Sequence, residues 1–137
     1  MQVNESRVVA ADPATVWKIG GDTANVADWI PALESSHQRG DMRYTTFAGG
    51  GEAVERIVEH DDQQRRYVYD YVSGPLPLEV YRSVFAVVDH PDGARITWDA
   101  DFRGTSAEED AALAQAISEI YRAALDELEN RVVRDRV

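Results

Sequence analysis

The spacing of apolar residues changes along this chain and divides it into strand-like and helix-like segments. Between Leu33 and Arg103, β-branched and aromatic residues recur at alternate positions, which is typical of β-strands. Turn-forming residues divide this segment into about six runs: Gly40-Asp41, Gly49-Gly50-Gly51, His60-Asp61-Asp62-Gln63, Ser73-Gly74-Pro75-Leu76-Pro77 and Pro91-Asp92-Gly93. With a further run at Gln2 to Ala10, the pattern predicts an antiparallel sheet of about seven strands.

Two short helices are expected after the first strand. Asp12-Pro13 supplies an N-cap followed by a proline at the first helical position, and Gly20-Gly21 ends the helix that follows. Asp22 predicts the cap of a second brief helix that reaches about Asp28.

The C-terminal segment predicts a long amphipathic helix of about 25 residues. Ser106 and Glu109 stand in capping-box spacing at its start. One helical face is apolar: Leu113, Ile117, Ile120, Tyr121, Ala124, Leu128 and Val132. At 1.5 Å per residue this helix is nearly 40 Å long, and only the sheet is large enough to cover its apolar face. We therefore expect one α+β unit, with residues 1–137 forming a single domain.

Composition narrows the classes of function. The 137 residues include no cysteine, which excludes disulfides and thiolate chemistry, and the net charge of −11 disfavours nucleic acid as a partner. No segment approaches the roughly 20 apolar residues of a membrane span, and the N-terminal segment has no basic leader. The expectation is a cytoplasmic protein, a monomer or a homodimer, without stable membrane insertion.

Many weak motifs, in order, resemble one family from end to end. They are Val3 to Ser6, Ala11-Asp12-Pro13, Val16-Trp17, Ala27-Asp28-Trp29-Ile30-Pro31, Ser35-Ser36, Gly40, Arg43, the glycines 49 to 51, Glu55-Arg56-Ile57, Asp61, Tyr67, Tyr69, Gly74 to Pro77, Tyr81, Trp98 and Phe102. The chain resembles the polyketide cyclase/dehydrase and lipid-transport family of the START/Bet v 1-like (SRPBCC) superfamily. The resemblance implies a helix-grip fold, in which a curved antiparallel sheet wraps around the long C-terminal helix and encloses a hydrophobic pocket.

Strand alternation and this resemblance together predict the pocket lining. Ile96, Trp98, Ala100 and Phe102 share one face and should point inward. Periodicity does not decide between Tyr67, Tyr69 and Tyr71 and the residues that alternate with them; the resemblance favours inward tyrosines. The predicted ligand-binding residues are Trp29, Arg43, Tyr69, Tyr71, Tyr81, Phe85, Trp98, Phe102, Ile117 and Tyr121. The alternative for the tyrosines is simple packing against the helix.

Arg43 and Glu55 are the candidate polar groups of the pocket. They fall on neighbouring predicted strands, and a buried carboxylate needs a partner such as a bidentate guanidinium. One interpretation is a structural ion pair. The other makes Arg43 an anchor for a ligand oxygen and Glu55 a counter-ion or a catalytic general base.

The remaining motifs give little support to other chemistry. His37, His60 and His90 are too scattered for a metal motif, no nucleophile elbow is present, and no metal or cofactor is expected. The leading hypothesis is a domain that binds a small hydrophobic or aromatic molecule, with cyclase, aromatase or dehydratase as the expected type of activity if it is an enzyme. The rival hypotheses are a non-catalytic carrier or sensor of a lipid, quinone or small metabolite, and a protein-interaction module with a vestigial pocket.

Overall fold

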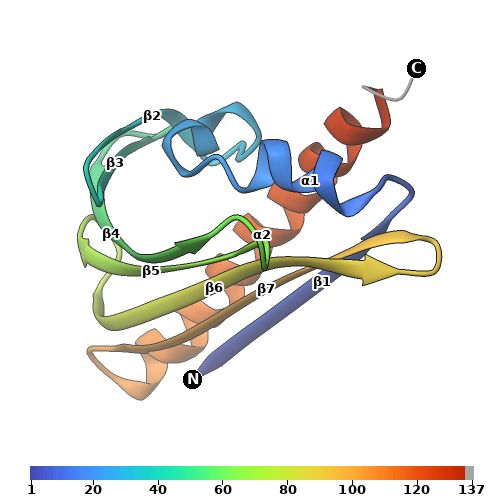
Figure 1. Ribbon diagram of the computed structural model, residues 1–137. Coiled ribbons are helices and arrows are strands. Elements are labelled where there is room, and N and C mark those ends of the chain that lie inside the picture. The colour runs from blue at the N-terminus through green and yellow to red at the C-terminus, as the bar shows by residue number, and fades with distance from the viewer. Residues whose placement is uncertain (135–137) are drawn as a thin grey trace.

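The computed structural model describes residues 1–134 and contains one sheet, two α-helices and one 3₁₀ helix (Figure 1). The last three residues of the predicted domain lie outside the described part. In chain order the elements are β1 (Gln2–Val9), α1 (Pro13–Gly20), η1 (Thr23–Asp28), β2 (Leu33–Arg39), β3 (Met42–Phe47), β4 (Glu52–Asp61), β5 (Arg66–Ser73), β6 (Leu78–His90), β7 (Gly93–Gly104) and α2 (Ala107–Arg134).

The sheet is an antiparallel meander with one long-range addition. Its strand order is β1-β7-β6-β5-β4-β3-β2, so each of β2 to β7 pairs with its neighbour in sequence while β1 joins β7. Gly93 forms the β6–β7 turn at a positive φ of 137°, where a Cβ would lie 2.3 Å from the Val9 carbonyl oxygen. Only glycine fits this turn, because the end of β1 lies directly over it.

The sheet curves around α2 in the helix-grip arrangement that the sequence predicts (Figure 1). Among the described elements, α2 lies closest to β1 and β7, and its C-terminal half also meets α1. The helix runs for 28 residues, slightly longer than expected. Its first turn is capped as predicted, because the Glu109 amide donates to Ser106 Oγ at 3.1 Å.

The two short helices differ in how they begin. Asp12 caps α1, since its carboxylate accepts from the Thr15 amide at 3.2 Å. The second is a 3₁₀ helix, and the side-chain cap predicted from Asp22 is wrong. The Asp22 carboxylate instead accepts from the Asn25 side-chain amide at 2.8 Å, and the backbone of η1 is held by Ser36, whose Oγ accepts from the Ala27 amide at 3.1 Å and donates to the Ala24 carbonyl at 2.9 Å.

The structure decides the orientation of β5, which periodicity left open. Tyr67 and Tyr69 are buried and Tyr71 is half-buried on the face toward α2, so the tyrosines point inward. Val68 is also buried, although it points to the opposite face, which explains the ambiguous pattern. Trp98 is only 2% exposed and lies inside, as its strand alternation predicts.

In the described part of the chain, no helix combines the length and the apolar character needed to cross a lipid bilayer.

Candidate functional site

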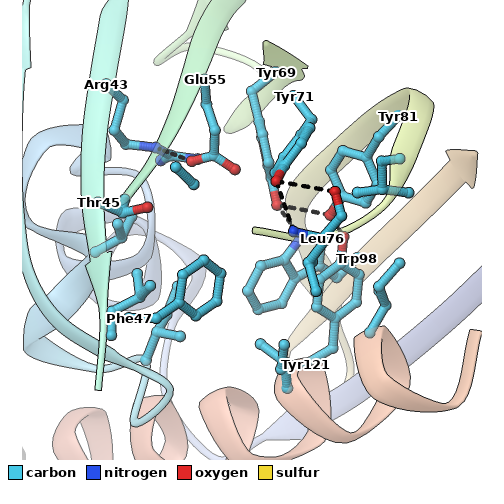
Figure 2. A pocket seen from close by; sticks show the side chains of 17 residues that line it. Arg43, Thr45, Phe47, Glu55, Tyr69, Tyr71, Leu76, Tyr81, Trp98 and Tyr121 are labelled. Carbon is cyan, nitrogen blue, oxygen red and sulfur yellow. Dashed lines mark hydrogen bonds and ion pairs between the residues drawn. The ribbon is translucent and has the colours of Figure 1, made fainter. Parts of the chain in front are cut away.

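A cavity of about 70 Å³ lies between the inner face of the sheet and the N-terminal half of α2 (Figure 2). Its lining is mainly aromatic and aliphatic and includes one guanidinium and one carboxylate: Val26, Ile30, Leu33, Arg43, Thr45, Phe47, Ala53, Glu55, Tyr69, Tyr71, Leu76, Leu78, Tyr81, Trp98, Ile117, Ile120 and Tyr121. An apolar enclosure with a few polar groups is the usual composition of a small-molecule site. At this volume the cavity holds a few waters, and even a single aromatic ring requires some expansion, since a cavity that binds benzene measures about 150 Å³.

Arg43 and Glu55 form an ion pair at one end of the cavity (Figure 2). The two residues stand opposite each other on β3 and β4, and Arg43 Nε donates to Glu55 Oε1 at 2.8 Å. Arg43 Nη1 also donates to the Thr23 carbonyl oxygen at 3.2 Å, which connects the pair to η1. The predicted meeting of these two side chains is confirmed.

Aromatic rings enclose the Arg43 guanidinium on the side of β5. Its central carbon lies 4.6 Å from the Tyr69 ring centroid and 5.7 Å from that of Tyr67, within cation–π range. Burial alone would lower the pKa of Arg43, but the Glu55 carboxylate and these tyrosines together raise it above its ordinary value. The guanidinium is therefore a permanent positive charge at this end of the cavity.

Hydroxyl groups gather at the other end of the cavity (Figure 2). Tyr69 and Tyr81 are hydrogen-bonded through their hydroxyls at 3.3 Å, and the Tyr81 hydroxyl is bonded in turn to that of Tyr121. Ser83 Oγ lies 2.9 Å from the Tyr121 hydroxyl, and Trp98 Nε1 donates to Ser83 Oγ at 3.1 Å and to the Tyr69 hydroxyl at 3.3 Å. We call these five side chains the hydroxyl cluster.

The hydroxyls of Tyr81 and Tyr121 are uncharged at neutral pH. Burial raises the pKa of Tyr81 and of Tyr121 well above the ordinary tyrosine value. The Trp98 and Tyr121 rings stack with centroids 3.9 Å apart and planes 9° apart, which fixes Tyr121 of α2 against β7. One end of the cavity is thus ionic and the other is neutral and polar.

The segment between β5 and β6 covers the cavity. Leu76 contributes a lining side chain, and its backbone is bound twice by Tyr71: the Leu76 amide donates to Tyr71 Oη at 3.1 Å and Tyr71 Oη donates to the Leu76 carbonyl at 3.4 Å. Gly74 lies so close to Tyr71 that a Cβ would come within 2.2 Å of the phenol oxygen. Gly74 therefore allows this segment to rest directly on Tyr71.

The predicted site residues divide into two groups in the structure. Most of them line the cavity: Arg43, Glu55, Tyr69, Tyr71, Tyr81, Trp98, Ile117 and Tyr121. Trp29, Phe85 and Phe102 were also predicted to bind ligand, but they lie in the packed core outside the cavity lining. Phe85, for example, packs against Trp17 and Trp29, and alternation correctly predicted its inward direction but not what it meets.

Sequence reasoning missed several residues of the site. Thr45 and Phe47 follow Arg43 at two-residue intervals on β3, so alternation from Arg43 would have found them. Ser83 shares a face with Tyr81 and is fully buried, but a serine in an apolar strand gave no signal of its role. Val26 and Ile30 come from η1 and the turn after it, where no periodicity exists.

Within residues 1–134, no group of three or more histidine, aspartate or glutamate side chains is arranged to hold a metal ion.

Comparison with known proteins extends over almost the whole chain. Residues 1–133 match the family model described as polyketide cyclase / dehydrase and lipid transport. No curated protein matches the sequence.

Solved structures match the fold over nearly their full lengths. The Bacillus cereus protein XoxI superposes with a TM-score of 0.89 at 23% identity, covering 99% of this chain and 98% of that one. A protein from Thermobifida fusca has 31% identity and a TM-score of 0.85, with 97% and 93% covered. The Zhui aromatase/cyclase from Streptomyces sp. R1128 has 17% identity and a TM-score of 0.87, with 100% and 96% covered. At 17–23% identity the likeness concerns the fold.

Proposed function

The chain belongs to the polyketide cyclase/dehydrase and lipid-transport family, whose members bind hydrophobic ligands and include cyclases and carriers, and from this premise we propose that the cavity binds a small, oxygen-bearing aromatic molecule. One observation carries the proposal: the cavity has aromatic walls and a different polar group at each end, Arg43–Glu55 and the hydroxyl cluster (Figure 2). Aromatic walls favour a flat ring, and the polar ends orient it.

Binding can be tested with a matched pair of variants on one strand. Thr45 is buried and lines the cavity, whereas its neighbour Thr46 points away from it. We expect Thr45→Phe to fill the cavity and abolish binding of 4-ethylphenol, measured by intrinsic tryptophan fluorescence and NMR shifts, while Thr46→Phe binds normally. Equal binding by both variants, or none by the unchanged protein, contradicts the proposal. Native mass spectrometry of protein purified from its own source would identify the molecule that occupies the cavity.

A second candidate function, catalysis of a cyclase or dehydratase type, is favoured by the arrangement of Glu55. Oε1 is bound to Arg43, but in the described part of the chain Oε2 makes no hydrogen bond, and Glu55 lines the cavity. A carboxylate placed there can remove a proton from a carbon next to a carbonyl, while Arg43 donates to the carbonyl oxygen.

The test is proton exchange at an enolisable carbon. We expect the protein to accelerate deuterium incorporation into 2-indanone in D₂O, followed by mass spectrometry, and Glu55→Gln to abolish the acceleration without changing affinity. This variant keeps the shape of the side chain and removes the carboxylate. Exchange no faster than in buffer rejects catalysis and leaves a non-catalytic carrier or sensor.

A further inference from the structure

The hydroxyl cluster contains one proton for each hydroxyl, so its hydrogen bonds can be assigned a direction. Ser83 Oγ lies 3.1 Å from the backbone carbonyl oxygen of Asp99. A carbonyl oxygen can only accept, so Ser83 donates its single proton there. Ser83 must then accept from Tyr121 across their 2.9 Å contact.

The same count continues through the tyrosines. Because the Tyr121 proton is used on Ser83, the contact between Tyr81 and Tyr121 requires Tyr81 to donate. Tyr69 must then donate to Tyr81 across 3.3 Å. Tyr69 in turn accepts from Trp98 Nε1 at 3.3 Å. Only one direction of the hydroxyl protons satisfies every contact at once: Tyr69 donates to Tyr81, Tyr81 to Tyr121, Tyr121 to Ser83, and Ser83 to the Asp99 carbonyl. The Trp98 N–H is shared between Tyr69 and Ser83, which both accept from it.

No tyrosine proton of the cavity remains for a ligand. Tyr71, the fourth tyrosine of the lining, donates to the Leu76 carbonyl and is also committed. Burial of Tyr81 and Tyr121 disfavours ionisation, so neither can act as a phenolate. The hydroxyl cluster therefore presents oxygen lone pairs to the cavity. It can accept hydrogen bonds from a ligand but has no free O–H group to donate.

The opposite end of the cavity has the complementary character. Arg43 has more N–H groups than its two acceptors, Glu55 and the Thr23 carbonyl, can use. Donors at the Arg43 end and acceptors at the Tyr69 end give the cavity a hydrogen-bond polarity. A ligand that matches it carries an acceptor at one end and a donor at the other.

We infer that the hydroxyl cluster selects a ligand bearing a hydrogen-bond donor, such as a phenolic hydroxyl or an aromatic N–H, and rejects one that presents only an acceptor there. This inference rests on the proposed function, since it describes specificity within the same cavity. A buried pairing of two acceptors leaves both unsatisfied, which typically weakens binding tenfold or more.

The experiment compares 4-ethylphenol, which can donate, with its methyl ether 4-ethylanisole, which can only accept. We expect the phenol to bind the unchanged protein at least about tenfold more tightly, measured by NMR titration. In Ser83→Ala the cluster loses the hydrogen bond that Ser83 donates to the Asp99 carbonyl. Its direction can then reverse, freeing the Tyr69 proton for the ligand, and the ratio of the two affinities should fall toward one. Taking the ratio between variants cancels differences in size and desolvation of the two probes.

Two further variants make the result specific. Glu59→Gln changes a surface carboxylate that pairs with Arg66 and lies outside the cavity lining, so it should leave the affinity ratio unchanged. A ratio kept in Ser83→Ala, or lost equally in Glu59→Gln, would show that the donor preference does not come from the cluster and would overturn the inference. Tyr121→Phe interrupts the cluster at a different point and should also lower the ratio, which keeps the test valid if Ser83→Ala does not fold. Equal binding of both probes by the unchanged protein rejects the inference alone. Binding of neither rejects the proposed function together with it.

Discussion

The two halves of α2 rest on the same sheet but face different surroundings. In the C-terminal half, Ala124, Leu125, Leu128 and Val132 are fully buried, and α1 closes over them. In the N-terminal half, Ile117 and Ile120 border the cavity, as does Tyr121 at the middle of the helix. The comparison suggests that the packed half supplies most of the stability and that the hollow half, where packing is incomplete, holds the ligand.

The largest expected effect compares two aliphatic truncations on this one helix. Leu128→Ala removes a fully buried side chain packed near Gly20 and Phe85, and should lower the free energy of unfolding by about 2–5 kcal/mol. Ile120→Ala, beside the existing cavity, should cost only about 1–2 kcal/mol, because Ile120 is half-buried and has fewer packing partners to lose. Urea denaturation of both variants provides the measurement. Equal losses would show that the two halves do not differ in the proposed way.

The next effect concerns the ionic end of the hollow half. Glu55→Gln removes the charge partner of a guanidinium that is 2% exposed, and should destabilise the fold by about 1–3 kcal/mol. Glu59→Gln on the same strand is the matched control, because Glu59 pairs with Arg66 at the surface at 2.9 Å. That change should cost less than about 1 kcal/mol. Similar losses in chemical denaturation would mean that Arg43 is hydrated well enough to tolerate the missing carboxylate.

A smaller effect is expected where the β5–β6 segment covers the cavity. Tyr71→Phe removes both hydrogen bonds to the Leu76 backbone and should cost about 1 kcal/mol or less. Hydrogen exchange at the Leu76 amide should become several-fold faster, while amides of β7 remain unaffected. If this segment also gates the cavity, as its two prolines and its position suggest, saturating 4-ethylphenol should slow exchange at Leu76 in the unchanged protein. Unchanged exchange in the variant would show that packing of Gly74 against the Tyr71 ring and Ala53, rather than the hydrogen bonds of the Tyr71 hydroxyl, holds the segment.

The smallest effect lies on the outer face of the sheet, away from both halves of the helix. Arg82 donates to both Asp70 oxygens, at 2.7 and 2.8 Å, and these bonds hold the pKa of Asp70 below its ordinary value. A lowered pKa in the folded state means that the pair adds stability above the unfolded-state pKa of about 3.9, and that this stability is lost as the pH falls through the folded-state pKa. Asp70→Asn should therefore lower the melting temperature slightly at pH 7. It should leave the melting temperature unchanged below the folded-state pKa of Asp70. An equal shift at both values of pH would exclude the carboxylate as its cause.

The fold was predictable because several local signals agree. The alternation of apolar residues predicted the strands, glycine and proline predicted the turns, and Ser106 predicted the start of α2. The apolar stripe on α2 was nearly correct but omitted Leu125, which is fully buried because α1 and the sheet cover that half from two sides. The apolar stripe was predicted for a helix covered by the sheet alone, so it did not include Leu125, which α1 helps to bury.

The site was only partly predictable, because alternation gives the direction of a side chain and not its depth along a strand. It correctly paired Arg43 with Glu55, which stand in register on β3 and β4. It also made Phe102 a pocket residue, although Phe102 is buried outside the cavity lining. The role of Ser83 depends on contacts with β7 and α2, which are brought together only by folding.

The pairing of β1 with β7 has a consequence for how the molecule assembles. Gln2 stands opposite Asp101, so the first strand finds its partner only after about a hundred intervening residues have been made. Contacts between such distant parts of a chain slow folding, because loop closure must precede any gain from pairing. During synthesis, β2 to β6 can form hairpins in turn while β1 remains unpaired. The helix α2 is made after β7 and only then covers the apolar face of the sheet. A nascent chain stopped before β7 would therefore expose an open strand edge and an uncovered aromatic surface, the features by which incomplete β-proteins aggregate.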